Sequence, residues 1–136
     1  MQRPKQRQNI SAYIKNANEI YNPDNFPPRF SFRFLVRHSD FGYESLNDNQ
    51  KVALIDTLNK LSQLKWAELR LAPRHGLGYE KIEKKAFNFV LPYDIPVDRS
   101  IIAFRFCGKA PMLGYRSAYG TFYIIAFDSK FIAYKH

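Results

Sequence analysis

The C-terminal segment from Ile101 to His136 constrains the fold of this chain more than any other stretch. Turn signals divide it into four runs rich in Phe, Tyr and Ile, and these signals lie at 108–111, 118–120 and 128–130. Aromatic and β-branched runs between such turns are typical of antiparallel strands joined by hairpins. We therefore expect a four-stranded antiparallel meander at the end of the chain.

The expected loop lengths set the register of this meander, because a strand turns alternate side chains to opposite faces. With the first loop taken as four residues, Arg105 lies opposite Gly114. A three-residue second loop places Arg116 opposite Phe122, and the third loop brings His136 opposite the same phenylalanine. This register separates the side chains of the meander into an apolar face and a polar face.

The apolar face of the predicted meander is a candidate core, made of Phe104, Phe106, Leu113, Tyr115, Tyr123, Ile125, Phe127 and Phe131. The other face carries the candidate catalytic residues Arg105, Arg116, Tyr134 and His136. Guanidinium groups match phosphate oxygens, an imidazole exchanges a proton near neutral pH, and a phenol hydrogen-bonds or stacks on a base. This set suits a phosphodiester substrate. The alternative is an ordinary solvated outer face, where arginine and lysine are common.

The charge of the chain favours polyanionic partners. Its 136 residues are enough for one domain with a core, and 46% of them are hydrophobic, which argues against a disordered basic tail. The 21 Lys and Arg residues against 12 Asp and Glu give a net charge of +9. Nucleic acid, an acidic protein inhibitor and an anionic membrane surface are the candidate partners, and composition alone does not choose among them.

Compartment and cofactors are constrained by what the sequence lacks. No apolar run reaches the roughly 20 residues that span a bilayer, and residues 1–9 are polar, so we expect no membrane anchor and a cytoplasmic protein. The single cysteine, Cys107, agrees with a reducing compartment. His38, His75 and His136 lie far apart without ligand-like spacing, so we expect no metal site.

The chain before the meander is expected to supply helices and one more strand. Residues 1–28 predict a basic arm and an amphipathic helix, ended by a proline-rich stretch. Residues 30–37 alternate as a strand of the same sheet, with one face formed by Phe30, Phe32, Phe34 and Val36. Asn47 and Gln50 have the spacing of a capping box, and the leucines that follow predict a helix over about 48–64 that packs on the sheet.

The segment 74–81 is expected to be a basic loop. Its two glycines match neither the dinucleotide-binding nor the P-loop pattern. Candidate RNA-binding residues here and near the meander are Arg74, His75, Lys81, Lys109 and Lys135. The alternative is a connecting loop with ordinary surface charge, although loops carry function more often than other segments do.

This order of elements in a small basic chain resembles the RelE/ParE superfamily of bacterial toxins. The matching segments are RHGLGYE (74–80), FRF (104–106), GYR (114–116), FYIIAFD (122–128) and YKH (134–136). The resemblance implies one α+β domain over 29–136. Its sheet is expected to be antiparallel, made of the N-terminal strand and the C-terminal four-stranded meander, with helices packed on one face. It also implies a toxin of a toxin–antitoxin system that cuts mRNA without a metal or organic cofactor and so inhibits translation.

The resemblance further implies a role for each candidate residue. Arg105 and Arg116 would clamp the phosphate attacked by the RNA 2′-hydroxyl, and His136 would act as general acid or base. Tyr134 would stack or donate a hydrogen bond. The implied partners are RNA, including RNA on the ribosome, and an acidic antitoxin protein. Some superfamily members bind gyrase and cut no RNA, so a non-catalytic module that binds nucleic acid or protein is the alternative.

Overall fold

The computed structural model describes residues 22–74, 76–91 and 95–135, which form a single α+β domain. Its helices within these ranges are α2 (Asp48–Leu61) and α3 (Trp66–Leu71). Its strands are β1 (Arg29–Ser31), β2 (Tyr79–Ile82), β3 (Ile101–Cys107), β4 (Ala110–Arg116) and β5 (Thr121–Phe127). Short 3-10 turns occupy Pro23–Asn25, Tyr43–Ser45 and Lys84–Ala86.

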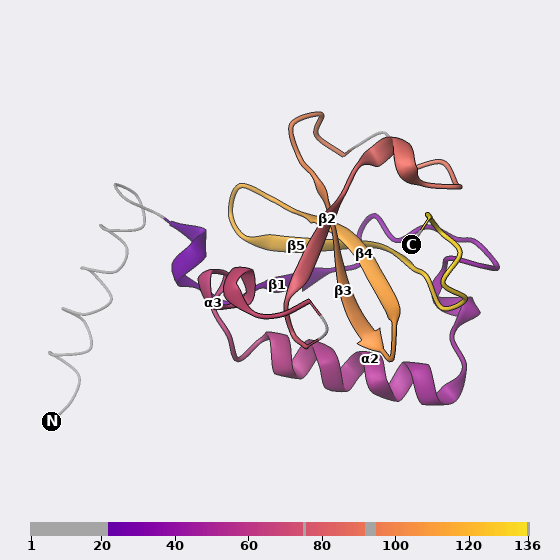
Figure 1. The fold of residues 1–136 in the computed structure, drawn as a ribbon, viewed down its shortest axis with the longest axis horizontal. Helices are drawn as coiled ribbons and strands as arrows, with labels where there is room; N and C mark the ends of the chain where they lie inside the picture. The colour runs from indigo at the N-terminus through magenta and orange to yellow at the C-terminus, as the bar shows by residue number, and fades with distance from the viewer. Residues whose placement is uncertain (1–21, 75, 92–94, 136) are drawn as a thin grey trace, which may run out of the picture.

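The five strands form one mixed sheet in the order β1-β5-β4-β3-β2 (Figure 1). β1 runs parallel to β5, whereas all other neighbours are antiparallel. The prediction of a fully antiparallel sheet is therefore wrong at β1. β2, which was expected to be the end of a loop, is instead the edge strand beside β3.

The run after β5 does not form the expected fourth strand of the meander. β1 already pairs with the outer edge of β5, and the Val36 N–H donates to the Ile125 carbonyl further along it (2.8 Å). The chain instead turns at Asp128, whose buried carboxylate accepts hydrogen bonds from two backbone N–H groups downstream. Among the described residues, this run forms β-type hydrogen bonding only at an isolated antiparallel bridge between Phe87 and Tyr134.

The register between β3 and β4 also differs from the predicted one. The connecting loop is Gly108–Lys109 instead of four residues, and the pairing shifts at a bulge between Arg105 and Cys107. Arg105 consequently lies opposite Pro111 and not opposite Gly114. An odd shift in register moves a side chain to the other face relative to its partner strand.

The hairpin between β4 and β5 has the predicted turn. Arg116 lies opposite Phe122, which confirms that part of the register. Gly120 has a φ of 84°, the left-handed conformation that a three-residue hairpin loop needs from its glycine. A second bulge between Leu113 and Gly114 then changes the pairing along the rest of the hairpin.

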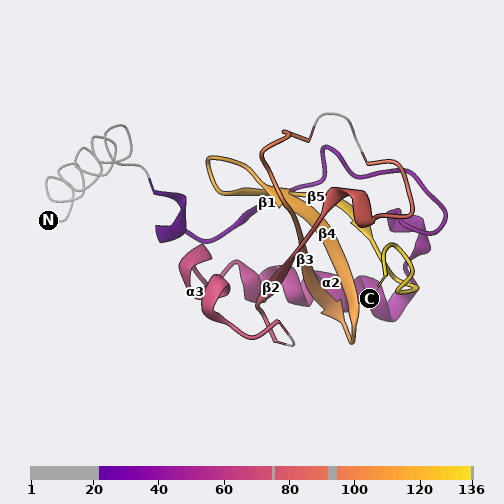
Figure 2. The same ribbon diagram turned by 45° about the horizontal axis from the view of Figure 1, so that its top comes forward.

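Both faces of the sheet are buried, so the predicted division into one apolar and one polar face is wrong. Helices α2 and α3 lie on one face of the sheet (Figure 2). This face packs the cluster Leu54, Leu61, Trp66, Leu69, Ile102, Phe104, Phe106, Met112, Phe122, Ile124 and Phe127. The opposite face is covered by irregular segments and packs Phe41, Ile82, Ile95, Ile101, Ala103, Leu113, Tyr115, Ile125, Ala126, Ala133 and Tyr134. Seven of the eight residues expected on one core face are thus divided between two faces, and the eighth, Phe131, belongs to neither cluster and is 37% exposed.

The strand predicted at 30–37 is shorter than expected. The Leu35 N–H donates to the Phe32 carbonyl (3.1 Å), and this turn ends β1 after Ser31. Phe30 packs against the helix-covered cluster, whereas Phe34 packs against the other one. The prediction that these phenylalanines share one face is therefore wrong.

The helices follow the sequence closely. Asn47 accepts from the Gln50 N–H (2.8 Å) and the Gln50 side chain accepts from the Asn47 N–H (3.0 Å), which confirms the capping box. Helix α2 packs on β3 through Leu54 and Leu61. It ends at Leu61, three residues before the predicted end, because Ser62 caps it.

The predicted basic arm and the whole of the predicted N-terminal helix lie within residues 1–21, outside the described residues. The remaining part of this region, residues 22–28, contacts the domain. The Trp66 N–H donates to the Phe26 carbonyl (3.1 Å), and Asp24 pairs with Arg70 and Arg116. Among the helices that the structure describes, none has the length and apolar character to cross a membrane.

Candidate active site

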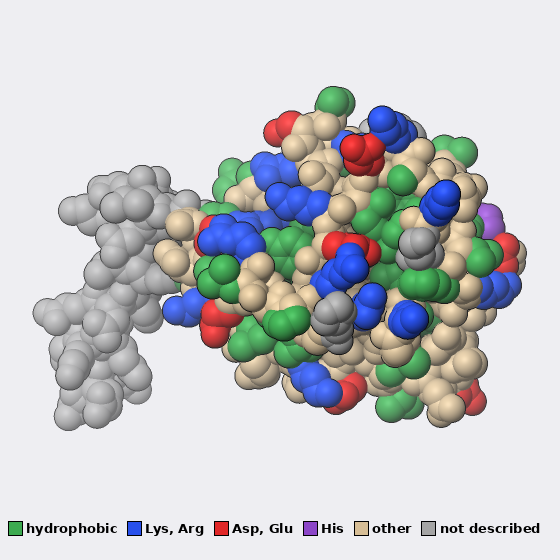
Figure 3. All heavy atoms as spheres, viewed as in Figure 1, with side chains coloured by type: hydrophobic (Ala, Val, Ile, Leu, Met, Phe, Trp, Pro, Cys, Tyr) green, Lys and Arg blue, Asp and Glu red, His purple; other side chains and the backbone are tan. Residues whose placement is uncertain are grey.

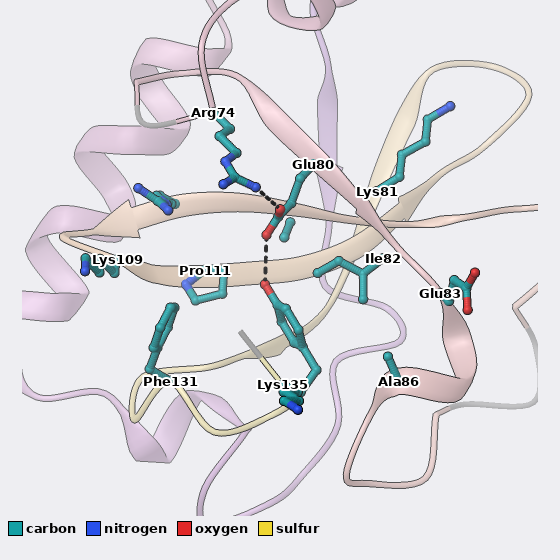
Figure 4. Close-up of a pocket in the computed structure, with 13 residues that line it drawn as sticks. Arg74, Glu80, Lys81, Ile82, Glu83, Ala86, Lys109, Pro111, Phe131 and Lys135 are labelled. Carbon is teal, nitrogen blue, oxygen red and sulfur yellow. Dashed lines mark hydrogen bonds and ion pairs between the residues drawn. The ribbon is translucent and has the colours of Figure 1, made fainter.

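The candidate site is a pocket of about 670 Å³ at the ends of β2, β3 and β4, on the sheet face away from α2 (Figure 4). Its lining includes seven charged residues: Arg74, Glu80, Lys81, Glu83, Arg105, Lys109 and Lys135. Figure 3 shows Lys and Arg side chains gathered around a carboxylate in the middle of one face of the molecule. The pocket therefore combines a positive field with a carboxylate.

Glu80 occupies the centre of this pocket because of the β2–β3 register. It pairs with Ala103, which places its side chain on the same face as Ala103 and as Arg105 two residues further along β3. One carboxylate oxygen accepts from Arg74 Nη1 (2.7 Å), and the other accepts from the Tyr134 hydroxyl (3.3 Å) (Figure 4). These two donors fix the orientation of the carboxylate.

Tyr134 reaches Glu80 because the C-terminal segment is tied down behind it. The Asp128 carboxylate accepts from the Ile132 N–H (2.7 Å) and the Ala133 N–H (3.0 Å). Asn88 adds two further bonds, since its backbone N–H donates to the Ala133 carbonyl and its side-chain amide to the Ile132 carbonyl (both 2.7 Å). The tyrosine is thus held by backbone hydrogen bonds on its N-terminal side.

Burial raises the pKa of the Tyr134 phenol well above its ordinary value, and the adjacent Glu80 carboxylate raises it further. The phenol is only 7% exposed, and its ring packs against Phe87 with 5.5 Å between ring centres. Tyr134 is therefore a neutral hydrogen-bond donor across the physiological pH range. Its buried ring is not accessible for base stacking, which leaves the hydrogen-bonding alternative of the two predicted roles.

Arg105 contributes a charge that makes no ion pair among the described residues. Its side chain is half-buried on the pocket wall, and no described carboxylate pairs with it. Lys109 and Lys135 are exposed on the pocket margin (Figure 4). A guanidinium with free donors beside an oriented carboxylate is suited to bind a phosphate next to a proton acceptor.

Arg116 lies on the opposite face of the sheet, so the predicted convergence of Arg105 and Arg116 is wrong. Arg105 lies opposite Pro111, and Arg116 is five residues further along β4, an odd separation that places the two guanidinium groups on different faces. The register expected from the sequence lacked the bulge between Arg105 and Cys107, which makes the shift odd.

Arg116 is engaged in interactions with the helix-covered side of the domain. Its guanidinium lies 4.9 Å from the centre of the Trp66 ring and 2.6 Å from the Asp24 carboxylate. The Arg116 hydrogen bond holds the pKa of Asp24 below its usual value, and the charges of Arg116 and Arg70 lower it further while burial opposes them. These contacts are typical of a structural arginine.

The remaining predicted site residues are Lys81, His75 and His136, and the structure describes only the first of them. Lys81 pairs with Ile102, which places it on the helix-covered side of β2, and in Figure 4 its side chain points away from Glu80. His75 and His136 lie outside the described residues. Glu80 was absent from the predicted site, although the alternation Tyr-Glu-Lys-Ile across 79–82 is a strand signal that would have placed it.

Within the described residues, no group of three or more His, Cys, Asp or Glu side chains is placed to hold a metal ion. No family model matches this chain, and no curated protein or solved structure matches it either. The resemblance to the RelE/ParE superfamily therefore remains a prediction from the sequence.

Proposed function

We propose that this protein is a RelE-like endoribonuclease that cleaves mRNA in the cytoplasm, with Glu80 as general base and Arg105 as the phosphate-binding residue. The observation that carries the proposal is the Glu80 carboxylate, which Arg74 and Tyr134 orient in the pocket that Arg105 also lines. No described carboxylate pairs with Arg105. A carboxylate acts as a base where a substrate hydroxyl reaches hydrogen-bond distance. An arginine stabilises the charge that develops on a phosphate.

The reaction is an internal transfer within the RNA. Glu80 takes the proton of the 2′-hydroxyl, whose oxygen bonds to the adjacent phosphorus while the bond from phosphorus to the 5′-oxygen breaks. Arg105 stabilises the phosphate oxygens during this step, with Lys109 and Lys135 adding positive charge. The 5′-oxygen takes a proton from an acid, for which His136, next to Lys135 in the sequence, is the predicted donor. The products are a 2′,3′-cyclic phosphate and a 5′-hydroxyl.

The net charge of +9 supports the same proposal, because mRNA is a polyanion. The RNA of the ribosome is a polyanion as well. It also fits an acidic antitoxin as the regulatory partner. The alternative is a non-catalytic module of the same fold, such as a gyrase inhibitor. The endoribonuclease and the non-catalytic module can be distinguished by removing the Glu80 carboxylate, because only the endoribonuclease needs a general base in the pocket.

The test is cleavage of end-labelled RNA by purified protein, with and without ribosomes, followed by analysis of the new ends. The proposal predicts 2′,3′-cyclic phosphate and 5′-hydroxyl ends. Glu80→Gln keeps the shape of the side chain but removes the base, so it should slow cleavage by about 10²–10⁴-fold. Folding should be retained, since Arg74 is 57% and Glu80 35% exposed, and ion pairs near the surface add at most about 1 kcal/mol.

The matched control is Glu83→Gln, which makes the same charge change three residues along the chain. Glu83 lies at the far end of the pocket, where it pairs with Lys85 (3.4 Å) and is 75% exposed (Figure 4). This variant should cleave like the unmodified protein. Cleavage that survives Glu80→Gln, or an absence of any cleavage under both conditions, would contradict the proposed reaction and favour the non-catalytic alternative.

A further inference from the structure

A second pocket, of about 350 Å³, lies where β3 begins and β4 ends. It is polar, and its cationic lining residues are Lys81, Arg99 and Arg116. Lys81 lies at the boundary with the candidate active site and lines both pockets, but in Figure 4 its side chain points away from Glu80. The volume of the second pocket is within the range of pockets that hold small molecules.

The register of the sheet brings polar residues together at this pocket. Lys81 pairs with Ile102, and Ile102 pairs with Gly114. Arg116 lies two residues beyond Gly114 and therefore on the same face as Lys81. Continuing the same pairing past the start of β3 places Ser100 opposite Arg116. The residues just before β3 therefore complete a pocket that begins on the edge strand β2.

The cations of the second pocket differ in how far the protein neutralises them. Arg116 is paired with Asp24 (2.6 Å). Arg99 is half-buried and Lys81 is exposed, and neither makes an ion pair among the described residues. Among these residues, Asp98 is the acidic one that lines the pocket, and it is exposed. A half-buried guanidinium without a partner lowers stability, and a bound anion would offset this loss.

Tyr79 adds a hydrogen-bond donor to the same pocket. Burial raises the pKa of its phenol, and the positive charges of Arg116 and Arg70 oppose this shift only in part. The phenol is therefore neutral at neutral pH, and a neutral phenol donates a hydrogen bond to an anion.

We propose that the second pocket binds the phosphate group of a small sugar phosphate, with Arg99 and Lys81 as the residues that hold it. A phosphomonoester carries about two negative charges at neutral pH, which matches the two cations without an ion-pair partner. A phosphodiester of an RNA backbone carries about one, so the charges favour the monoester. The Asp98 carboxylate repels a bare anion but accepts hydrogen bonds from hydroxyl groups, which the sugar supplies.

The inference does not depend on the ribonuclease proposal, because Glu80 and Arg105 are not part of the second pocket. Its test is an NMR titration of the full chain with ribose 5-phosphate. The Trp66 indole is the reporter, since its ring lies 4.9 Å from the Arg116 guanidinium and 6.0 Å from the Tyr79 ring, and both of these residues line the pocket.

We expect a saturable shift of the Trp66 indole resonance with ribose 5-phosphate. The backbone amides of Arg105 and Lys135, which line the candidate active site, should stay in place. Ribose lacks the phosphate and should give no shift of the indole, and neither should chloride at the same ionic strength. Inorganic phosphate should bind more weakly than ribose 5-phosphate, because it has no sugar hydroxyl groups for Asp98.

Variants of the lining residues test each contact. Arg99→Gln and Lys81→Gln should each weaken binding of ribose 5-phosphate by about tenfold, because each removes a hydrogen bond between charged groups. The matched control is Lys85→Gln, which makes the same charge change at an exposed lysine outside the pocket and should bind like the unmodified protein. Asp98→Ala should reduce the preference for ribose 5-phosphate over inorganic phosphate, since it removes both the hydroxyl acceptor and the repulsion.

Three results would overturn the proposed phosphate site: equal indole shifts with ribose 5-phosphate and chloride, the absence of a saturable shift, and unaltered affinity in Arg99→Gln or Lys81→Gln. Shifts of the Arg105 and Lys135 amides with an unchanged Trp66 indole would assign the ligand to the candidate active site and refute the second site. An unchanged preference in Asp98→Ala would refute the sugar contact. RNA cleavage is measured separately, so none of these results bears on the ribonuclease proposal.

Discussion

Arg105 and Arg116 lie on the same sheet, and the difference between their surroundings separates a candidate site from a structural contact. Arg116 stacks on Trp66 and pairs with Asp24, so its charge is neutralised inside the domain. Arg105 lines a pocket in which no described carboxylate pairs with it, next to an oriented Glu80. A half-buried charge without a partner lowers the stability of the folded protein, and a bound anion would offset this loss.

The contrast teaches that an arginine on a strand is informative only together with its partners. Both arginines have the residue type that a phosphate site needs, and both lie near the end of a strand. Only one of the two faces combines free guanidinium donors with a proton acceptor. The predictions below test this contrast, beginning with the largest expected effect.

Arg105→Ala should abolish most activity and preserve the fold. Removing a donor that stabilises transition-state charge costs about 10²–10³-fold in rate. The melting temperature should hardly change, because no described ion pair is lost. Single-turnover cleavage and thermal unfolding of the same preparation measure the two effects. Arg37→Ala, which removes an exposed arginine outside this pocket, is the control and should match the unmodified protein in both.

Arg116→Ala should have the opposite outcome. It removes the contact with Trp66 and leaves the carboxylate of Asp24 without its closest cation, so we expect a loss of about 2 kcal/mol in the free energy of unfolding. The cleavage rate below the melting transition should be unchanged. A stable Arg116→Ala protein that has lost cleavage would reverse the assignment of the two faces.

Asp24→Asn should reduce stability in a pH-dependent way, by about 1 kcal/mol at neutral pH. Arg116 lowers the folded-state pKa of Asp24 below its unfolded value, so the carboxylate stabilises the fold above that unfolded value. This contribution is lost as the pH falls through the folded-state pKa. Urea unfolding from neutral pH into acid should therefore show the two stability curves converging, and a constant separation would contradict the pairing.

Tyr134→Phe should have the smallest effect on stability at neutral pH, about 0.5–1 kcal/mol for the lost hydrogen bond to Glu80. The folded-state pKa of Tyr134 is raised, so its contribution is complete below the unfolded pKa of about 10 and is lost as the pH rises above it. Stability measured through this alkaline range should fall more steeply for the unmodified protein than for Tyr134→Phe. Parallel curves would indicate a solvated phenol.

Much of the fold follows from local patterns. Turn residues and aromatic alternation placed β3, β4 and β5, and the capping box at Asn47 placed the start of α2. These signals depend on neighbours in the sequence, which is why they were sufficient. Pairing at the two edges of the sheet depends on distant residues, so neither the parallel pairing of β1 with β5 nor the pairing of β2 with β3 could be derived in the same way.

The candidate site was predicted in part. Arg105, Tyr134, Arg74, Lys109 and Lys135 do line one pocket. Arg116 was assigned to it because the bulge between Arg105 and Cys107 was not foreseen. The loop was taken as two residues too long, which alone keeps the face, but the bulge adds a one-residue shift that the alternation of a strand converts into a change of face. The link between Glu80 and Tyr134 joins residues 54 positions apart, which no local pattern reveals.

The measurement that tests the contrast most directly is an NMR titration with single-stranded 2′-O-methyl RNA. The chain has one tryptophan, and the indole N–H of Trp66 donates to the Gly120 carbonyl (2.8 Å) beside Arg116, so this resonance reports on the helix-covered face alone. We predict saturable shifts of the backbone amides of Glu80, Arg105 and Lys135 with the Trp66 indole unchanged. A shift of the Trp66 indole while those amides stay in place would contradict the assignment of the pocket.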